Sequence, residues 1–494
     1  MAAFTELVDL ASERVGGAAI AANDEFFAAR ENLIKVSRPV FVEGRYTERG
    51  KWMDGWETRR RRTPGSDWCL LRLGLPGVVH GFVVDTTHFR GNHPEYCSIE
   101  GCTVAGSPDL EHLTGDAEVW EEILPKSPLE SDKENLFEVD SARRFTHLRL
   151  HIYPDGGVAR LRVHGEALPD PKQLSGPSEI DLAAMENGGL ALAASDMCFG
   201  SRNHLILPGP ALNMGEGWET RRRRGPGHDW IVIQLAGAGT IRRLEVDTTH
   251  FKGNYPESCS MDTCEVDAPT ADVEAWPWRE VLSRVRLQPD SRQFFEGEVR
   301  TTGPASHIRF HIYPDGGVAR LRVWGRLSEH GRWNAAIRRL NALSAVEAEQ
   351  ELRRCCGSQR WAQAMTGHRP YALSREILET ADRVWEGLES ADWLEAFSHH
   401  PRIGQQSADR WAREEQAIVA QAGGSVMDAL LRANREYEGR FGYIFIVQAT
   451  GKSAEEVLKV LSLRLENEPA VELEVAAEEQ RKINHLRLEK LLSQ

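Results

Sequence analysis

The residues best suited to chemistry in this sequence are polar side chains that occur twice in the same local context. His88 and His250 each stand in the sequence DTTHF, and each is followed by a glutamate, Glu95 or Glu257. Loops rarely need such side chains for packing, so shared polar residues in turn-rich segments carry more information than shared leucine or valine. A histidine or carboxylate could transfer a proton on a small substrate, which typically contributes about 10²- to 10⁴-fold to a rate.

A run of four arginines precedes each of these histidines, within the repeated sequence GWETRRRR. The planar guanidinium group forms bidentate contacts with carboxylate and ureido oxygens, so Arg59 and Arg221 are candidate substrate-binding residues. The alternative is a solvated or ion-paired segment that is neutralised by nearby carboxylates, in the first copy Glu57, Asp67 and Asp85. The histidine clusters also have two interpretations, a site or a structural turn, and the sequence leaves both open.

A third candidate lies near the C-terminus, where SHHPRIG places His400 directly before Pro401. Histidine changes its protonation near neutral pH, so His400 could transfer a proton there. The alternative is a histidine that is favoured at a helix C-terminus by the helix dipole.

An internal duplication must position the first two candidates. GWETRRRR, VDTTHF and HIYPDGGVARLRV each occur twice in the same order, at offsets of 162, 162 and 160 residues. Alternating apolar and basic residues in ARLRV are typical of half-buried strands, and Pro-Gly and Asp-Gly-Gly pairs mark turns. We therefore expect two β-sandwich or jelly-roll domains, at residues 1–170 and 181–328.

The remainder of the chain, residues 331–494, has helical periodicity and predicts a separate all-α domain. Ser344 with Glu347 and Ser453 with Glu456 have the spacing of capping boxes at two helix starts. We expect Pro469 to end the second of these helices, and GYIFIVQAT to form one short extended run.

Composition excludes several classes of protein. A net charge of −14 makes nucleic acid a poor partner, because phosphate binding needs a concentrated positive surface. No apolar run approaches the roughly 18 residues of a membrane helix, and the acidic N-terminus lacks signal-peptide features. We expect a cytoplasmic protein without membrane contact. The 8 cysteines favour reduced core thiols over disulfides or a metal site, and no metal-ligand signature is present.

The repeated motifs resemble allantoicase over about residues 20–330. The resemblance implies hydrolysis of allantoate to ureidoglycolate and urea by two β-sandwich repeats of jelly-roll, galactose-binding-like type, in a homo-oligomer. Our hypothesis makes His88 and His250 the acid–base residues, with Glu95, Glu257, Arg59 and Arg221 as substrate-binding residues. The two sites cannot be equivalent, because the second copy has Lys252, Tyr255 and Ser258 where the first has Arg90, His93 and Tyr96.

Residues 331–494 resemble 2-oxo-4-hydroxy-4-carboxy-5-ureidoimidazoline (OHCU) decarboxylases, which form S-allantoin without a cofactor. The resemblance implies that His400 and Glu415 are catalytic, and that the substrate is bound by Gln416, Phe441, Gly442, Ile444 and Arg487. One departure is Ala412, where many relatives have serine; Ser407 is a possible replacement. The adjacent C=N and carbonyl of the substrate ring can accept the electrons that decarboxylation leaves, so the protein need only orient the carboxylate and move a proton.

Together these observations predict a bifunctional enzyme of urate breakdown that acts on two small-molecule substrates without a cofactor. The alternative is a decarboxylase fused to β-sandwich modules that bind a ligand without catalysis.

Overall fold

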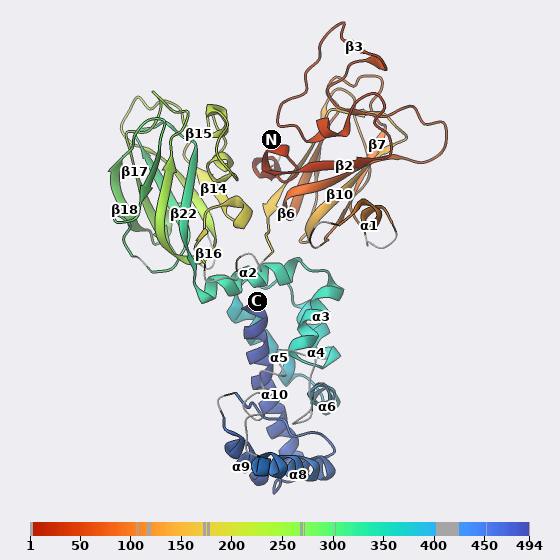
Figure 1. Cartoon of the computed structure of the whole chain (residues 1–494), viewed down its shortest axis with the longest axis vertical. Helices are drawn as coiled ribbons and strands as arrows, with labels where there is room; N and C mark the ends of the chain where they lie inside the picture. Colours follow the sequence, from red (N-terminus) through yellow and green to blue (C-terminus); the bar gives the residue numbers. More distant parts are fainter. Residues whose placement is uncertain are drawn as a thin grey trace. The chain divides into compact units, whose positions relative to one another are not determined.

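The computed structural model describes residues 3–104, 106, 108–115, 120–170, 174, 178–266, 270, 272–301, 303–401, 424–450 and 452–493. The chain divides into two compact units, Met1–Ala335 and Ala336–Gln494. The first contains the β-strands and the second is helical (Figure 1). In the described part of the chain, no helix is both long and apolar enough to cross a membrane.

The first repeat is an antiparallel sandwich built around one long strand, β6 (Asp67–Asp85). The first half of β6 pairs with β10 (Arg144–Tyr153) and β2 (Ala18–Ala22), and the second half pairs with β12 (Arg160–Ala167) and β9 (Glu134–Glu138). The remaining strands are β1 (Val8–Asp9), β5 (Trp56–Glu57), β7 (Tyr96–Cys102), β8 (Glu121–Pro128) and β11 (Gly157–Val158).

Glycines let β6 serve both layers of the sandwich. A Cβ at Gly74 would lie 2.4 Å from the backbone nitrogen of Gly17, and one at Gly77 would lie 2.1 Å from the carbonyl oxygen of Glu166. Only glycine permits such close backbone approach, and the pairing of β6 with β10 shifts in register between Arg72 and Gly77.

The second repeat has the same strand order around β16 (Asp229–Asp247). Its other strands are β13 (Ile180–Asp181), β14 (Leu190–Ala194), β15 (Trp218–Glu219), β17 (Ser258–Cys264), β18 (Arg279–Arg286), β19 (Arg292–Phe295), β20 (Ala305–Tyr313), β21 (Gly317–Val318) and β22 (Arg320–Leu327). The predicted fold class, two β-sandwich repeats followed by a helical domain, is confirmed.

The two sandwiches share one continuous cluster of buried apolar side chains. Polar contacts also join them: Arg14 Nε lies 2.8 Å from Glu216 Oε2, and Asn203 donates to the carbonyl oxygen of Glu6 at 2.7 Å.

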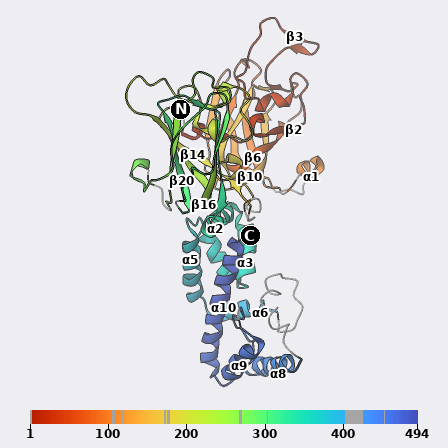
Figure 2. The same ribbon diagram turned by 60° about the vertical axis from the view of Figure 1, so that its left-hand side comes forward.

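The helical unit begins at Ala336, within α2 (Glu329–Ala342), whose first residues belong to the first unit. It comprises α3 (Ala345–Cys355), α4 (Gln359–Gly367), α5 (Ser374–Glu386), α6 (Ser390–Ser398), α8 (Gly424–Phe441), α9 (Ala454–Arg464) and α10 (Pro469–Leu492). Figure 2 shows α10 running along this unit, with α8 and α9 beside one end of it.

Both predicted capping boxes are present, at Ser344 with Glu347 and at Ser453 with Glu456. The expectation for Pro469 was wrong: α9 already ends at Arg464, and Pro469 begins α10. Proline suits the first helical turn, where its missing N–H has no helical partner to lose. Residues 444–449 of the expected extended run form no regular strand.

Candidate functional site

His400 follows the end of α6 and faces the long helix α10. Its backbone N–H donates to the carbonyl oxygen of Phe397 at 3.1 Å, so the last turn of α6 fixes its position. Its Nδ1 atom lies 3.4 Å from Nη2 of Arg487, which is buried on α10. Nε2 of the same ring is shielded from solvent and makes no hydrogen bond with a described residue.

The surroundings of His400 hold its imidazole neutral. A guanidinium group can only donate, so Nδ1 accepts from Arg487 and the ring proton belongs on Nε2. Burial, together with the positive charge of Arg487, lowers the pKa of His400 to about 3, although the Gln480 side chain opposes the shift. The sequence suggested a group that titrates near pH 7. Desolvation, which the sequence does not reveal, accounts for the difference.

Arg487 belongs to a polar stripe on α10. Gln480, Asn484 and Arg487 are all buried, and their spacing places them on one helix face. Gln480 Nε2 donates to Asn484 Oδ1 at 2.9 Å. Sequence reasoning missed Gln480 and Asn484, although polar residues at helical spacing from Arg487 were a usable signal.

The segment FGYIF is held against the same region. Gly442 leaves α8 with φ of +82°, and the Tyr443 ring packs on Phe397 with centroids 5.3 Å apart. Arg464 donates to the carbonyl oxygen of Ile446 at 2.8 Å. The segment that contains Phe441, Gly442 and Ile444 therefore contacts the last turn of α6 through Tyr443. Glu415 and Gln416, and also Ala412 and Ser407, lie outside the described residues.

A buried ion pair anchors this segment. Arg464 Nη2 lies 2.6 Å from Oε1 of Glu472, which is fully buried and also accepts a hydrogen bond from the Tyr437 hydroxyl. Gln448 N–H donates to Glu479 on α10 at 2.8 Å, which fixes the far end of the segment.

In each sandwich the three repeated motifs meet at one place. In the first repeat, Asn92 Nδ2 donates to Glu57 Oε1 at 2.7 Å, and the carbonyl oxygen of Asn92 accepts from Gly157 at 2.7 Å. The Arg61 N–H donates to Asp155 Oδ2 at 2.8 Å. The second repeat has the same bonds, with Asn254 donating to Glu219 at 2.6 Å. Burial raises the pKa of Glu57, with Asn92 acting against the shift.

The predicted acid–base histidines occupy a strained turn beside this junction. His88 and His250 have φ of 73° and 75°, a conformation that is uncommon for residues other than glycine. Their backbone N–H groups donate to Asp132 and Asp290, each at 2.8 Å. The rings differ: His250 Nε2 lies 3.0 Å from the carbonyl oxygen of Ala211, whereas the ring of His88 lies 5.8 Å from that of Phe41.

The arginine runs are partly ion-paired, through Arg59, Arg61 and Arg223. Arg59 lies 2.7 Å from Asp24, and Arg61 lies 2.6 Å from the buried Asp67. Arg221 contacts Cys198 Sγ at 3.7 Å through Nη2. Of the three carboxylates expected to neutralise the first run, only Asp67 pairs with one of its arginines. Glu57 instead accepts from Asn92, and Asp85 accepts from the backbone of Thr87.

Glu95 and Glu257 are both exposed, and Arg284 lies 3.8 Å from Glu257. Among the described residues, no hydrogen bond or ion pair joins His88 to Glu95 or Arg59. The residues predicted for the sandwich sites therefore lie near the place where the three motifs meet. They do not form one hydrogen-bonded group.

The histidine of HIYPDGG is a further candidate that sequence reasoning did not select. His311 Nδ1 lies 2.8 Å from His228 Nε2, and His311 Nε2 lies 3.1 Å from Asp262. In the first repeat, His151 lies 3.3 Å from both Ser66 and Glu100. The sequence did offer a signal for this histidine, because it occurs in both copies of HIYPDGG.

No group of three or more histidine, cysteine, aspartate or glutamate side chains that could hold a metal ion occurs within the described ranges. The cysteines are free, and all except Cys198 are buried.

Comparison with known proteins assigns each part of the chain. The family described as allantoicase repeat matches residues 8–168 and 180–328, and the OHCU decarboxylase family matches residues 341–489. A protein of Burkholderia mallei named probable allantoicase 1 is 47% identical over 326 residues, which are 65% of this chain and 95% of that protein. The allantoicase of Dictyostelium discoideum is 45% identical over 322 residues, 65% of this chain and 87% of its own length.

A solved structure agrees with these matches. The crystal structure of allantoicase from Saccharomyces cerevisiae is 36% identical and has a TM-score of 0.54. The similarity covers 65% of this chain and 93% of the yeast chain.

Proposed function

The chain belongs to the allantoicase family and continues into an OHCU decarboxylase domain, and from this premise we propose that it catalyses two reactions. It is a bifunctional enzyme of the allantoin pathway that acts on small molecules. The sandwich repeats hydrolyse allantoate to ureidoglycolate and urea, and the helical domain decarboxylates OHCU to S-allantoin.

The observation that carries the second reaction is the close pair of His400 and the buried Arg487, 3.4 Å apart. A guanidinium beside a shielded imidazole suits a substrate that has both a carboxylate and an exchangeable proton. The substrate carboxylate binds Arg487. This moves the guanidinium group away from Nδ1 of His400 and offsets the positive charge of Arg487. Both changes raise the pKa of His400, so the imidazole becomes able to exchange a proton with the substrate.

The bond to the carboxylate then breaks and CO₂ leaves. The electron pair passes into the adjacent C=N and carbonyl of the ring, and the carbon takes up one proton. Phe441, Gly442 and Ile444 contact the ring, and Glu415 and Gln416 hold the hydroxyl and ureido groups.

For the first reaction, allantoate and one water give ureidoglycolate and urea. The departing urea nitrogen needs a proton, and the central carbon needs water. His88 or His250 supplies the acid–base group, and Arg59, Arg221, Glu95 and Glu257 contribute substrate contacts. The raised pKa of Glu57 adds this carboxyl as a second acid–base candidate.

We also propose functional boundaries at residues 1–170, 181–328 and 331–494, a homo-oligomer, and a cytoplasmic location. The separate compactness of Ala336–Gln494 supports an independent decarboxylase domain. The net charge of −14 disfavours nucleic-acid binding.

The test is an assay of both reactions on the full-length chain. Fresh OHCU, made by urate oxidation, should give S-allantoin detectable by circular dichroism at a rate above buffer alone. Allantoate should release urea in a separate assay. Urea release also decides against non-catalytic ligand-binding sandwiches, which would bind allantoate without consuming it.

A further inference from the structure

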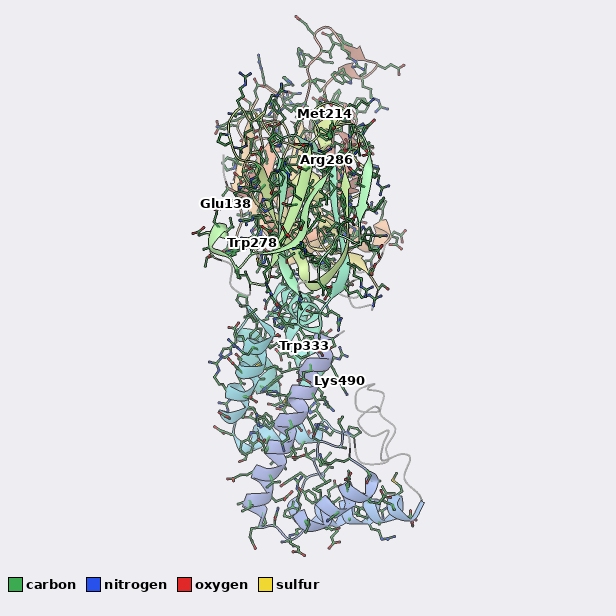
Figure 3. All side chains as sticks on the ribbon, turned by 90° about the vertical axis from the view of Figure 1, so that its left-hand side faces the viewer. Glu138, Met214, Trp278, Arg286, Trp333 and Lys490 are labelled. Atoms are coloured by element: carbon green, nitrogen blue, oxygen red, sulfur yellow. The ribbon has the colours of Figure 1, made fainter. Side chains whose placement is uncertain are left out.

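An open pocket of about 530 Å³ lies on the solvent side of the second sandwich. Leu321 and Val323 of β22 are fully buried in the core, so the alternate residues Arg320, Arg322 and Trp324 face away from the core and line the pocket. Asp181 of β13 is part of the same pocket wall. Figure 3 shows the side chains of this sandwich and labels Met214, the first residue of its short 3-10 helix Met214–Glu216.

Three polar atoms in this wall are buried but make no hydrogen bond with described residues. They are Nη2 of Arg320, Nη1 of Arg322 and Oδ2 of Asp181. Arg320 is only 2% exposed and Asp181 only 5%. The shortest opposite-charge distances are 3.7 Å from Arg320 to Glu216 and 3.6 Å from Arg322 to Asp181. Buried polar groups are normally satisfied, so three unsatisfied atoms on side chains that line one open pocket mark it as a candidate ligand site.

The first repeat satisfies the corresponding atoms internally. Nη2 of Arg160 bonds Asp54 Oδ2 at 2.8 Å, and Nε of the same side chain bonds the carbonyl oxygen of Ser37 at 2.9 Å. Arg162 donates to Asp9 at 3.4 Å and to the carbonyl oxygen of Val36 at 3.3 Å. Residues 35–55, which precede β5, thus lie over this face.

Two sequence differences explain why the second repeat leaves these atoms open. The segment before β15, residues 207–217, is shorter than residues 35–55. The position of Asp54 is taken by Glu216. Because its Oε2 pairs with Arg14 at 2.8 Å, the same oxygen lies 3.7 Å from Arg320, too far for a hydrogen bond. The pocket wall also contains the ion pair of Glu245 with Arg292, where the first repeat has Val83 and Glu134.

We propose that this pocket in the second repeat binds the ureido acid, and that the first repeat has no equivalent binding site. The inference rests on the proposed allantoate hydrolysis and gives it a location. Other nitrogens of these arginines already donate to backbone carbonyl oxygens, so Nη2 of Arg320 and Nη1 of Arg322 remain to donate to a carboxylate or a ureido oxygen. Oδ2 of Asp181 accepts a ureido N–H. A simple polyanion would use the arginines but would be repelled by the carboxylates of Asp181, Glu245 and Asp247.

The charges and the neighbouring turn agree with this assignment. Burial lowers the pKa of Arg320 to about 10, which still leaves it charged at neutral pH. Pro210 lines the pocket, and the next residue, Ala211, accepts the hydrogen bond from His250. The acid–base candidate of the second repeat is therefore bonded to the pocket rim.

Arg322→Gln tests the proposal, with Arg162→Gln as the matched control at the same position of the first repeat. Binding is measured by calorimetry with N-carbamoylglycine, which keeps a carboxylate and one ureido group but lacks the second ureido group. Arg322→Gln should weaken binding roughly 10- to 100-fold, because a charge-assisted hydrogen bond is lost. The affinity of Arg162→Gln for N-carbamoylglycine should stay within about twofold of the wild-type value, since Arg162 lies in the other repeat. The kcat/KM for urea release from allantoate should follow the same order.

A second variant covers the case in which Arg322→Gln fails to fold. Glu245→Val combined with Arg292→Glu gives the pocket the residues that the first repeat already accommodates. The number of carboxylates stays the same, but the pocket loses the positive charge of Arg292, which should weaken N-carbamoylglycine binding and lower kcat/KM for allantoate, with thermal unfolding close to the wild type.

Wild-type binding and urea release that persist in both pocket variants, or that fall equally in Arg162→Gln, would overturn the assignment but leave the proposed function standing. A wild-type protein that releases no urea would instead remove the proposed function, whatever the pocket binds.

Discussion

His400 and Arg487 are 87 residues apart in the sequence, yet Nδ1 of the first lies 3.4 Å from Nη2 of the second. The helix α10 makes this approach possible, because its buried polar face returns along the helical unit to the end of α6. The pair combines a group that can hold a carboxylate with one that can exchange a proton, as decarboxylation requires.

Replacing His400 should remove one activity and spare the other. We expect His400→Asn to reduce S-allantoin formation by about 10²-fold or more, because the acid–base group is lost. Urea release from allantoate should be unchanged. The neighbouring exposed residue gives the control, His399→Asn, which should retain both rates. A fully active His400→Asn protein would rule out the assigned role.

The pKa of His400 predicts a pH-dependent stability. The pKa is lowered on folding to about 3, so the folded state binds a proton less readily than the unfolded state. The contribution of neutral His400 to the stability of the folded state is therefore fully present above the unfolded pKa, near 6.5, and is lost as the pH falls toward about 3. Between pH 7 and pH 5.5 the opening free energy of α10 should fall by about 1 kcal/mol relative to His400→Asn. Hydrogen exchange of α10 peptides in the full chain measures this difference; equal pH dependence in both proteins would contradict it.

The buried pair of Arg464 and Glu472 should matter far more than surface pairs. Arg464→Met leaves a fully buried carboxylate without its cation and should cost about 3 kcal/mol or more. The double variant Arg464→Met/Glu472→Leu should recover part of this loss. Arg481→Met breaks a partly exposed pair with Asp382 and should cost about 1 kcal/mol or less. Hydrogen exchange of α9 and α10 reports each value, and a double variant less stable than Arg464→Met would refute the argument.

The two turn histidines should contribute unequally to urea release. Because His250 is bonded to the rim of the open pocket, His250→Asn should lower kcat for allantoate by about 10²- to 10⁴-fold. His88→Asn should change it little. Asparagine is chosen because it tolerates the positive φ at both positions. Unchanged turnover in the double variant would show that neither histidine is the acid–base group.

Repetition and periodicity made the fold predictable. The two copies of HIYPDGGVARLRV correctly indicated strands, which are β10 and β12 in the first repeat and β20 and β22 in the second, and both capping boxes mark real helix starts. Pro469 was misjudged because proline is compatible both with the end of one helix and with the first turn of the next.

The sites were less predictable, because burial and loop length decide them. Arg320 and Arg160 occupy identical motifs, but only the structure reveals that Asp54 bonds Arg160 and that Arg14 holds the Glu216 carboxylate away from Arg320. Likewise, the sequence identifies His400 as a titratable residue and cannot reveal the desolvation that keeps it neutral.

The most direct test of two separate active sites is a side-by-side assay of urea release and S-allantoin formation. It compares the wild type, His400→Asn and Arg322→Gln as full-length proteins. We expect the wild type to catalyse both reactions, His400→Asn to lose only S-allantoin formation, and Arg322→Gln to lose only urea release. A wild type inactive in both assays, or loss of both activities in either variant with folding intact, would contradict this account.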